Sequence, residues 1–219
     1  MPEIWKNRIM YTYCDEDPGF IDLKEEIEDI IPDIRYYSSY NFVGERIDGY
    51  QEPLALMSKE AALKLKEAAD EFRKDGYLIK VYDAYRPQIA VDHFIRWASD
   101  PDDERMKEYF YPEVNKDELF EKGYIAQHSS HSRGSTIDLT LYDIENKMDI
   151  DVGSCFDYFG EISHANYKGI SDEQYRNRIY LKKVMMKHDF EGIEEEWWHF
   201  TLKDEPYPDT YFTFPVKKR

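Results

Sequence analysis

SSHSRGSTIDLTLY, residues 129–142, is the stretch that decides the fold. Its second half alternates between two faces, which predicts a strand with apolar side chains on one side and polar ones on the other: Ile137, Leu139 and Leu141 against Thr136, Asp138 and Thr140. Gly134 can adopt a backbone geometry closed to other residues, so it predicts a turn that folds His131 back toward Asp138. Because a carboxylate on a buried strand is costly unless it is paired or binds a metal, these two residues are predicted to be metal ligands.

A third ligand is predicted near the end of the chain, in EWWHF, residues 196–200. This aromatic run is typical of a strand. Residues three apart face opposite ways in a strand, so Glu196 and His199 reach one site only if Glu196 lies in the bend that enters the strand. Two histidines and an aspartate with an open fourth position are what a catalytic zinc requires. The sequence therefore predicts one Zn²⁺ bound by His131, Asp138 and His199, with Glu196 beside it.

His128 is the obvious rival ligand, because it stands three residues before His131. It lies outside the motif, and the other three residues already supply the ligands that the site needs. We therefore expect His128 to take no part in binding the metal.

The rest of the chain predicts an α+β fold in a single domain, residues 1–219, with a mainly antiparallel sheet that carries the zinc site and is flanked by helices. Hydrophobic periodicity and capping residues predict helices at 59–74, 89–98, 100–111 and 172–188, and strands at 34–42 and 77–82. Residues 1–32 suggest no chemistry, and residues 203–219 are expected to form a polar tail.

Arg86 lies in DAYRP, residues 83–87, directly after the strand predicted at 77–82. Pro87 disfavours helical geometry at the residue before it, which holds Arg86 at the end of the strand. An arginine there could form a surface ion pair, or it could reach the metal site and stabilise a developing oxyanion. The residues alone favour neither alternative.

Composition limits the class of protein and its partners. A chain of 219 residues, 42% of them hydrophobic, is long enough for one domain with a substantial core. Its net charge of -17 disfavours nucleic acid and anionic membrane as partners. The charge identifies no substrate, and the sequence does not define the oligomeric state.

The sequence also predicts a cytoplasmic location. Residues 1–8 contain no apolar segment of signal-peptide length, and no apolar run approaches a membrane span. The two cysteines, Cys14 and Cys155, are expected to be free thiols rather than a disulfide.

Several motifs together resemble the zinc D-alanyl-D-alanine dipeptidases and related carboxypeptidases, and the vancomycin-resistance type of dipeptidase looks closest. The resemblance rests on the metal motifs described above and on further segments in the same order: NFVG at 41–44, GY at 49–50, DAYRP at 83–87, FD at 156–157 and EWWH at 196–199. It covers roughly residues 30–202. The chain departs from the family at Thr136, where alanine is usual.

The resemblance implies roles for individual residues. Glu196 would act as general base and then general acid, and Arg86 would stabilise the oxyanion. Ser129, Tyr36 and Asp157 would bind the substrate, a small dipeptide, with the last two near its amino end. Without the resemblance, Tyr36 would be assigned to a half-buried strand and Asp157 to an exposed loop.

Three other functions are considered. A zinc D,D- or L,D-carboxypeptidase or endopeptidase would trim longer peptidoglycan peptides with the same motif. A zinc-stabilised binding module without catalysis would need neither Glu196 nor Arg86, and its fourth metal position would normally be closed. A nutrient-recycling dipeptidase would share the chemistry of D-alanyl-D-alanine hydrolysis, so the sequence does not separate catabolism from antibiotic resistance.

Overall fold

The computed structural model describes residues 11–218. The expectation that residues 1–8 carry no leader falls outside this range. Among the described residues, no helix combines the length and the apolar character that crossing a membrane demands.

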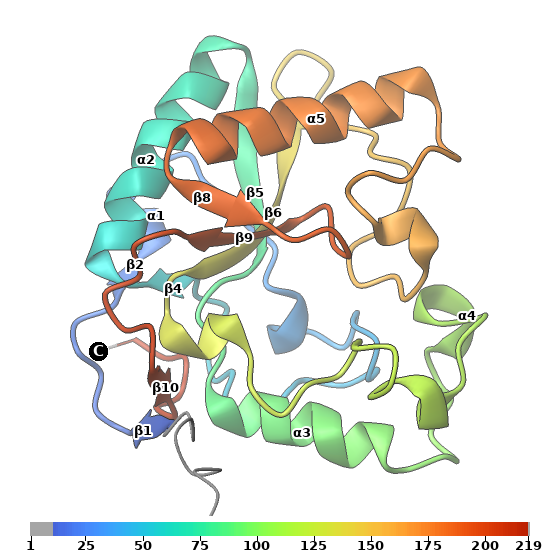
Figure 1. The fold of residues 1–219 in the computed structure, drawn as a ribbon. Helices are drawn as coiled ribbons and strands as arrows, with labels where there is room; N and C mark the ends of the chain where they lie inside the picture. The colour runs from blue at the N-terminus through green and yellow to red at the C-terminus, as the bar shows by residue number, and fades with distance from the viewer. Residues whose placement is uncertain (1–10, 219) are drawn as a thin grey trace, which may run out of the picture.

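A six-stranded sheet forms the centre of the described part of the chain (Figure 1). Its order is β3-β5-β6-β9-β8, and the short strand β7 also pairs with β6. All neighbours are antiparallel except β3 and β5, which confirms the predicted mainly antiparallel sheet. The strands are β3 Ile31–Pro32, β5 Tyr77–Asp83, β6 Thr136–Asp143, β7 Met148–Asp149, β8 Phe190–Gly192 and β9 His199–Leu202.

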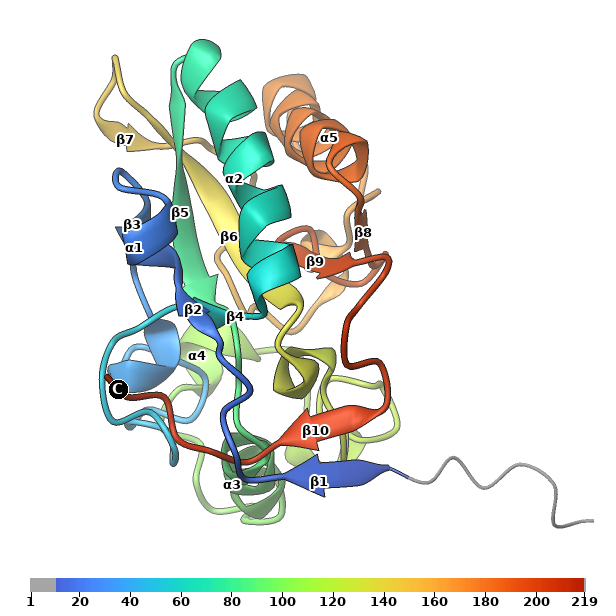
Figure 2. The same cartoon turned by 90° about the vertical axis from the view of Figure 1, so that its left-hand side faces the viewer.

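Two long helices, α2 (Lys59–Lys74) and α5 (Asp172–Lys187), pack side by side over one face of this sheet (Figure 2). The bounds of α2 are those predicted, and its buried stripe includes Leu65 and Phe72. A capping box formed by Ser171 and Gln174 begins α5. The shorter α3 (Gln88–Ala98) follows the end of β5, and α1 (Leu23–Glu26) contacts α2. The fold is therefore α+β, as the sequence predicts.

The register of the central strands places polar residues in one row. In the β5–β6 pair Asp83 lies opposite Asp138, and in the β6–β9 pair Asp138 lies opposite His199. Three residues far apart in the sequence are thus neighbours across three strands. This row forms the floor of the candidate site.

The turn predicted before β6 is present as a short 3-10 helix, η3 (Ser130–Arg133), which ends at Gly134. Gly134 has a φ of +81°, in the left-handed region, and its amide donates to the His131 carbonyl at 3.0 Å. A Cβ on Gly134 would lie 2.0 Å from the nearest atom of the Phe20 ring. Both the conformation and the available space therefore require glycine.

Two predicted elements differ from the structure. Residues 34–42 form a 3-10 turn, η1 (Arg35–Tyr37), and a loop instead of a strand. The side chain of Asn41 explains this, because its Nδ2 donates to the carbonyls of Ser38 and Glu45, both at 2.8 Å, and its Oδ1 accepts from two backbone amides. Only Lys107–Phe110 (α4) is α-helical in the segment 100–111.

The C-terminal segment is not the polar tail that we expected. Strand β10 (Thr210–Phe212) pairs in parallel with β1 (Thr12–Cys14), and several apolar side chains beyond residue 203 are buried: Tyr211, Phe212, Phe214 and Val216. Phe214 stacks on Tyr85 with ring centroids 4.4 Å apart. A second pair joins β2 (Ile21–Asp22), within the region to which no chemistry was assigned, to β4 (Leu56–Met57), just before α2.

Replacing Gly134 by alanine should destabilise the protein much more than the same change at Gly76. Gly76 also has a positive φ, +92°, but no atom lies within 4 Å of the position that an alanine methyl group would take there. The control variant should therefore lose about 1–2 kcal/mol, the cost of the left-handed conformation. Gly134→Ala adds the overlap with Phe20 and should lose at least about 3 kcal/mol. Denaturant unfolding of both variants measures the difference, and equal losses would contradict the packing argument.

Candidate metal centre

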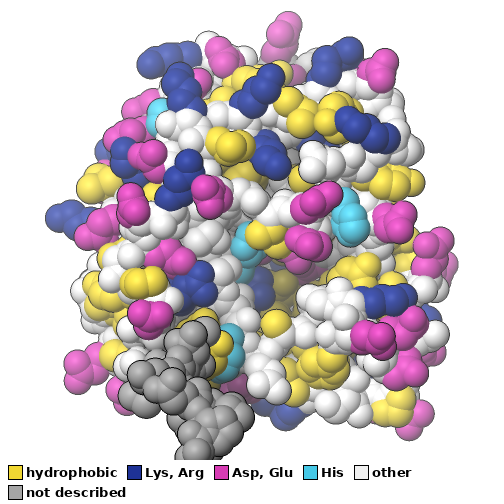
Figure 3. Space-filling view, viewed as in Figure 1, with side chains coloured by type: hydrophobic (Ala, Val, Ile, Leu, Met, Phe, Trp, Pro, Cys, Tyr) yellow, Lys and Arg dark blue, Asp and Glu magenta, His cyan; other side chains and the backbone are white. Residues whose placement is uncertain are grey.

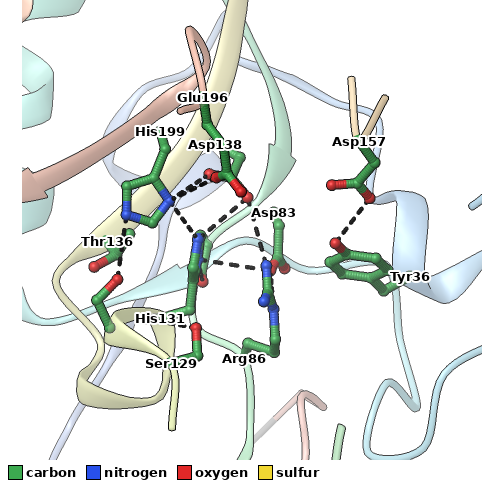
Figure 4. Close-up of polar contacts among 12 residues, drawn as sticks. Tyr36, Asp83, Arg86, Ser129, His131, Thr136, Asp138, Asp157, Glu196 and His199 are labelled. Atoms are coloured by element: carbon green, nitrogen blue, oxygen red, sulfur yellow. Dashed lines mark hydrogen bonds and ion pairs between the residues drawn. The ribbon is translucent and has the colours of Figure 1, made fainter. Parts of the chain in front are cut away.

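His131, Asp138 and His199 come together in one buried cluster. The distance from His131 Nε2 to His199 Nδ1 is 3.3 Å, and from His131 Nε2 to Asp138 Oδ2 it is 3.2 Å. His199 Nδ1 lies 3.1 Å from Asp138 Oδ1. η3, β6 and β9 each supply one of these side chains (Figure 4).

These separations fit a tetrahedral metal. Zinc–nitrogen and zinc–oxygen bonds of about 2.0–2.1 Å at tetrahedral angles place ligand atoms roughly 3.3 Å apart. The two imidazole nitrogens lie 3.3 Å apart, each is 3.1–3.2 Å from one oxygen of the Asp138 carboxylate, and all three residues are buried. The set of two imidazoles and one carboxylate also matches the chemistry of zinc ligands.

The second nitrogen of each imidazole has a partner of its own. His131 Nδ1 donates to the Ala84 carbonyl at 2.7 Å, and His199 Nε2 lies 3.2 Å from Ser130 Oγ. Such contacts fix the orientation of metal-binding histidines. They leave His131 Nε2 and His199 Nδ1 facing each other and Asp138.

The electrostatics of Asp138 suit a ligand that must stay ionised. Burial alone would raise the pKa of its carboxyl group. The attraction of His131 and hydrogen bonds with both histidines outweigh burial, so the pKa lies well below its ordinary value.

Glu196 lies in the bend before β9, as predicted, with Oε2 3.5 Å from His199 Nδ1. Its side chain is 36% exposed and lines the pocket, so the carboxylate can meet a solvent molecule at the metal site. The pKa of Glu196 is raised, mainly by desolvation. The charge of His199 lowers it, and the charge of Asp138 raises it further. A carboxyl group with a raised pKa next to an open metal position is suited to accept and return a proton.

Arg86 reaches the same site and is held by Asp83, a residue to which the sequence assigned no role. Its Nε donates to Asp83 Oδ2 at 2.8 Å, and the Tyr50 hydroxyl donates to Asp83 Oδ1 at 2.6 Å. Another guanidinium nitrogen, Nη2, lies 3.5 Å from Asp138 Oδ2. Of the two alternatives left open for Arg86, the surface ion pair is excluded, because the Asp83 side chain is only 1% exposed.

The cluster lies in a pocket of about 290 Å³. Figure 3 shows a hollow near the middle of the viewed face, where histidine, acidic and basic side chains gather among hydrophobic ones. Part of the wall comes from Gly123–Ala126, Phe94 and Ile193, which the sequence did not place at the site. These residues carry no motif, and only the fold brings them there.

Tyr36 and Asp157 form a second polar pair in this pocket. The Tyr36 hydroxyl donates to Asp157 Oδ2 at 2.8 Å, and both residues are buried. The Arg86 guanidinium lies 4.9 Å from the centroid of the Tyr36 ring, between this pair and the metal cluster (Figure 4). The pKa of Asp157 lies well above its usual range, mainly because the carboxyl group is buried and secondly because the charge of Asp138 is nearby. Asp157 is thus not the exposed loop acid, nor Tyr36 the half-buried strand residue, of the alternative assignments.

Three further residues that the sequence singled out have clear positions. Ser129 lines the pocket, and its Oγ accepts from the His131 amide at 3.3 Å. His128 also lines the pocket, outside the metal cluster, with its ring 4.1 Å from that of Tyr11. Thr136 does not belong to the lining residues, and its Oγ1 lies 2.9 Å from Thr201 Oγ1. The departure from the family at Thr136 therefore changes the strand pair rather than the pocket wall.

A three-residue metal cluster with a carboxylate and an arginine at its open side is the arrangement of a metal-dependent hydrolase. Comparison with known families agrees: a peptidase family model described as D-ala-D-ala dipeptidase matches residues 16–217. The chain belongs to this family. The family model matches residues 16–217 and so extends beyond both ends of residues 30–202, the range covered by the motif resemblance.

Curated relatives cover nearly the whole chain. A D-alanyl-D-alanine dipeptidase of Enterococcus faecalis is 45% identical over 198 residues, 90% of this chain and 98% of that protein. Proteins of the same name from Enterococcus faecium and Streptomyces coelicolor are 41% and 38% identical, and each match covers 91% of this chain and 98% of the relative.

Among solved structures, the chain is similar to a mutant of the vancomycin resistance D,D-pentapeptidase VanY in complex with Zn(II). The TM-score is 0.41 at 15% sequence identity, and the match covers 72% of this chain and 78% of that one.

The cluster should bind about one Zn²⁺ per chain, as measured by elemental analysis of the purified protein. His131→Ala and His199→Ala each remove one of three ligands and should leave the protein without stoichiometric zinc. His128→Ala is the matched control, a nearby pocket histidine outside the cluster, and it should keep the metal. Full zinc occupancy in His199→Ala would disprove the assignment of the ligands.

Proposed function

We propose that this protein is a zinc-dependent dipeptidase that hydrolyses D-alanyl-D-alanine to two molecules of D-alanine. One observation carries the proposal: the metal cluster and the buried Asp157–Tyr36 pair line the same pocket, with Arg86 between them. A pocket of about 290 Å³ is at the small end of ligand sites, which suits a dipeptide. The names of the curated relatives support the same substrate.

His131, Asp138 and His199 hold the metal through the donor atoms described above. When bound, Zn²⁺ acts as a Lewis acid that polarises the scissile carbonyl and lowers the pKa of water. Glu196 takes the proton from the attacking water and delivers it to the nitrogen of the leaving amine. Its place beside His199 Nδ1, on the exposed side of the cluster, supports this role.

Arg86 stabilises the negative charge that develops on the carbonyl oxygen. Its guanidinium is fixed before the substrate arrives, because Asp83 accepts from Nε and the rings of Tyr36 and Phe94 lie beside it at 4.9 and 5.3 Å. A donor that needs no reorganisation is an effective stabiliser of a transition state.

Asp157 and Tyr36 anchor the free ammonium of the dipeptide, and Ser129 helps to orient it. Burial makes an ionised Asp157 costly, so a cation at this position gains from pairing with it. A longer peptide or an N-blocked substrate offers no such cation. This favours the dipeptidase over the carboxypeptidase or endopeptidase alternative, and a purely structural zinc site would need neither the pocket nor Glu196.

We also propose that residues 1–219 form one zinc peptidase domain and that the enzyme works in the cytoplasm. Nearly all buried apolar residues of the described range form one cluster. Cys14 and Cys155 are both free, which suits a reducing compartment. Cell fractionation tests the location, and recovery of the protein with the cell envelope would contradict it.

Two variants should separate the proton-transfer group from the oxyanion donor. Glu196→Gln should keep zinc and fold while kcat falls by about 10²–10⁴. Arg86→Lys keeps a charge for buried Asp83 but loses the fork geometry, so kcat should fall by about 10²–10³ with little change in KM. Steady-state kinetics and zinc analysis measure both. Glu196→Gln activity within a few-fold of wild type would assign the base elsewhere, and an effect of Arg86→Lys on KM alone would make Arg86 a ground-state anchor.

The wild-type protein should cleave D-alanyl-D-alanine and discriminate against its N-acetyl derivative on the order of 10⁴-fold in kcat/KM. The acetyl group removes the cation and leaves Asp157 desolvated and unpaired. Asp157→Asn keeps the shape of the side chain and should reduce both dipeptide cleavage and the discrimination. Efficient release of D-alanine from an N-blocked tripeptide by the wild type would favour the carboxypeptidase alternative.

A further inference from the structure

Arg178 on α5 is a buried arginine for which the proposed mechanism has no use. Its side chain is 2% exposed, and its guanidinium donates to three backbone carbonyls: Val152 at 2.6 Å, His164 at 2.7 Å and Ile162 at 2.8 Å. A longer contact of 3.4 Å reaches Ser154 Oγ. All four acceptors belong to one segment, residues 152–164.

The charge of Arg178 is balanced in an unusual way. Within residues 11–218 it forms no ion pair; its guanidinium donates to carbonyls, and the charge of Asp151 acts on it only from beyond ion-pair distance. Desolvation lowers the pKa of Arg178 to about 10, and the charge of Asp151 opposes this shift only in part. A buried cation is tolerated only when its donors are well satisfied, so the position depends on the shape of the segment around it.

The segment that Arg178 binds carries the substrate anchor. Asp157 lies between Val152 and Ile162, so the guanidinium holds both arms of the loop that presents its carboxylate. Asp157 has a φ of +60°, in the left-handed region that residues other than glycine rarely adopt. Such a conformation persists where the surrounding structure enforces it.

The same segment is tied to the bend that carries Glu196. Trp197 Nε1 donates to Ser154 Oγ at 2.9 Å, and the Trp197 amide donates to the Ser163 carbonyl at 3.0 Å. The amide of Ala165 donates to the Glu194 carbonyl at 2.7 Å. Trp197, directly after Glu196, is therefore hydrogen-bonded to the loop that Arg178 organises, and Glu194 is hydrogen-bonded to Ala165, the residue after that loop.

We propose that Arg178 is a positioning residue that sets the separation between the ammonium anchor Asp157 and the proton-transfer group Glu196, and so selects dipeptides with a free amine. This inference rests on the proposed function and deepens it. Arg178 is not among the residues that line the pocket, and it acts through the backbone of residues 152–164. The metal ligands lie on η3, β6 and β9, outside this segment, and none of them is a hydrogen-bond partner of Arg178, so we expect zinc binding to survive its replacement.

The test compares Arg178→Lys with Arg176→Lys, an exposed arginine two residues earlier on the same helix. A lysine carries the charge but lacks the fork that reaches carbonyls on both arms of the loop. In Arg178→Lys, discrimination between D-alanyl-D-alanine and its N-acetyl derivative should fall about 10- to 100-fold, with zinc content unchanged. Arg176→Lys should match the wild type in all respects.

Hydrogen exchange supplies a readout that does not depend on activity. Peptides covering residues 152–165 and 194–197 should exchange faster in Arg178→Lys than in Arg176→Lys. Unchanged exchange, or a parallel loss of activity on both substrates at constant discrimination, would overturn the proposal. Failure of the wild type to cleave the dipeptide would refute the proposed function, whereas the exchange result would still test whether Arg178 holds the loop.

A second variant covers the case in which Arg178→Lys does not fold. Ser154→Ala removes the acceptor shared by Trp197 and Arg178 but leaves the three carbonyl contacts in place. It should lower discrimination in the same direction by a smaller factor and speed exchange at residues 194–197. Wild-type discrimination and exchange in Ser154→Ala would contradict a link between the loop and the Glu196 bend.

Discussion

The pairing of β6 with β5 and β9 is the constraint on which the site depends. This register sets Asp138 opposite Asp83 on one side and opposite His199 on the other. Asp83 then fixes Arg86, and η3 brings His131 to the same carboxylate. A slip of one residue would turn Asp138 to the other face of the sheet and separate the ligands. Fold and site are therefore specified by the same hydrogen bonds.

Burial of acidic groups explains why this pocket should bind cations. Asp83, Asp138 and Asp157 are buried around the guanidinium of Arg86, and Glu196 adds a fourth carboxyl group at the rim. Burial and the neighbouring charge of Asp138 both raise the pKa values of Asp157 and Glu196. A dication between the ligands and an ammonium at Asp157 would relieve this repulsion, which joins metal binding and substrate choice in one electrostatic account.

The sequence predicted the parts of the molecule in which local pattern and chemistry coincide. Strand alternation and Gly134 placed His131 near Asp138. The three-residue separation of Glu196 from His199 placed Glu196 in a bend, because both could not face the site from one strand. It did not predict β10, because prolines and charges hid the apolar residues around Phe212 and Phe214. The role of Arg178 depends on carbonyls 14 to 26 residues away, and Asp83, although only three residues from Arg86, is brought to the site by its place opposite Asp138, which no local pattern reveals. The family resemblance, rather than the pattern of residues, brought Tyr36 and Asp157 into the site.

Diffraction from crystals of the Glu196→Gln protein with zinc and D-alanyl-D-alanine tests the central claim most directly, because the variant should bind the dipeptide without cleaving it. The account predicts one anomalous peak at the zinc edge among His131 Nε2, His199 Nδ1 and the Asp138 carboxylate. It also predicts the dipeptide ammonium within hydrogen-bond distance of Asp157. Zinc at another position, or a dipeptide whose amine points to solvent away from Asp157, would contradict it.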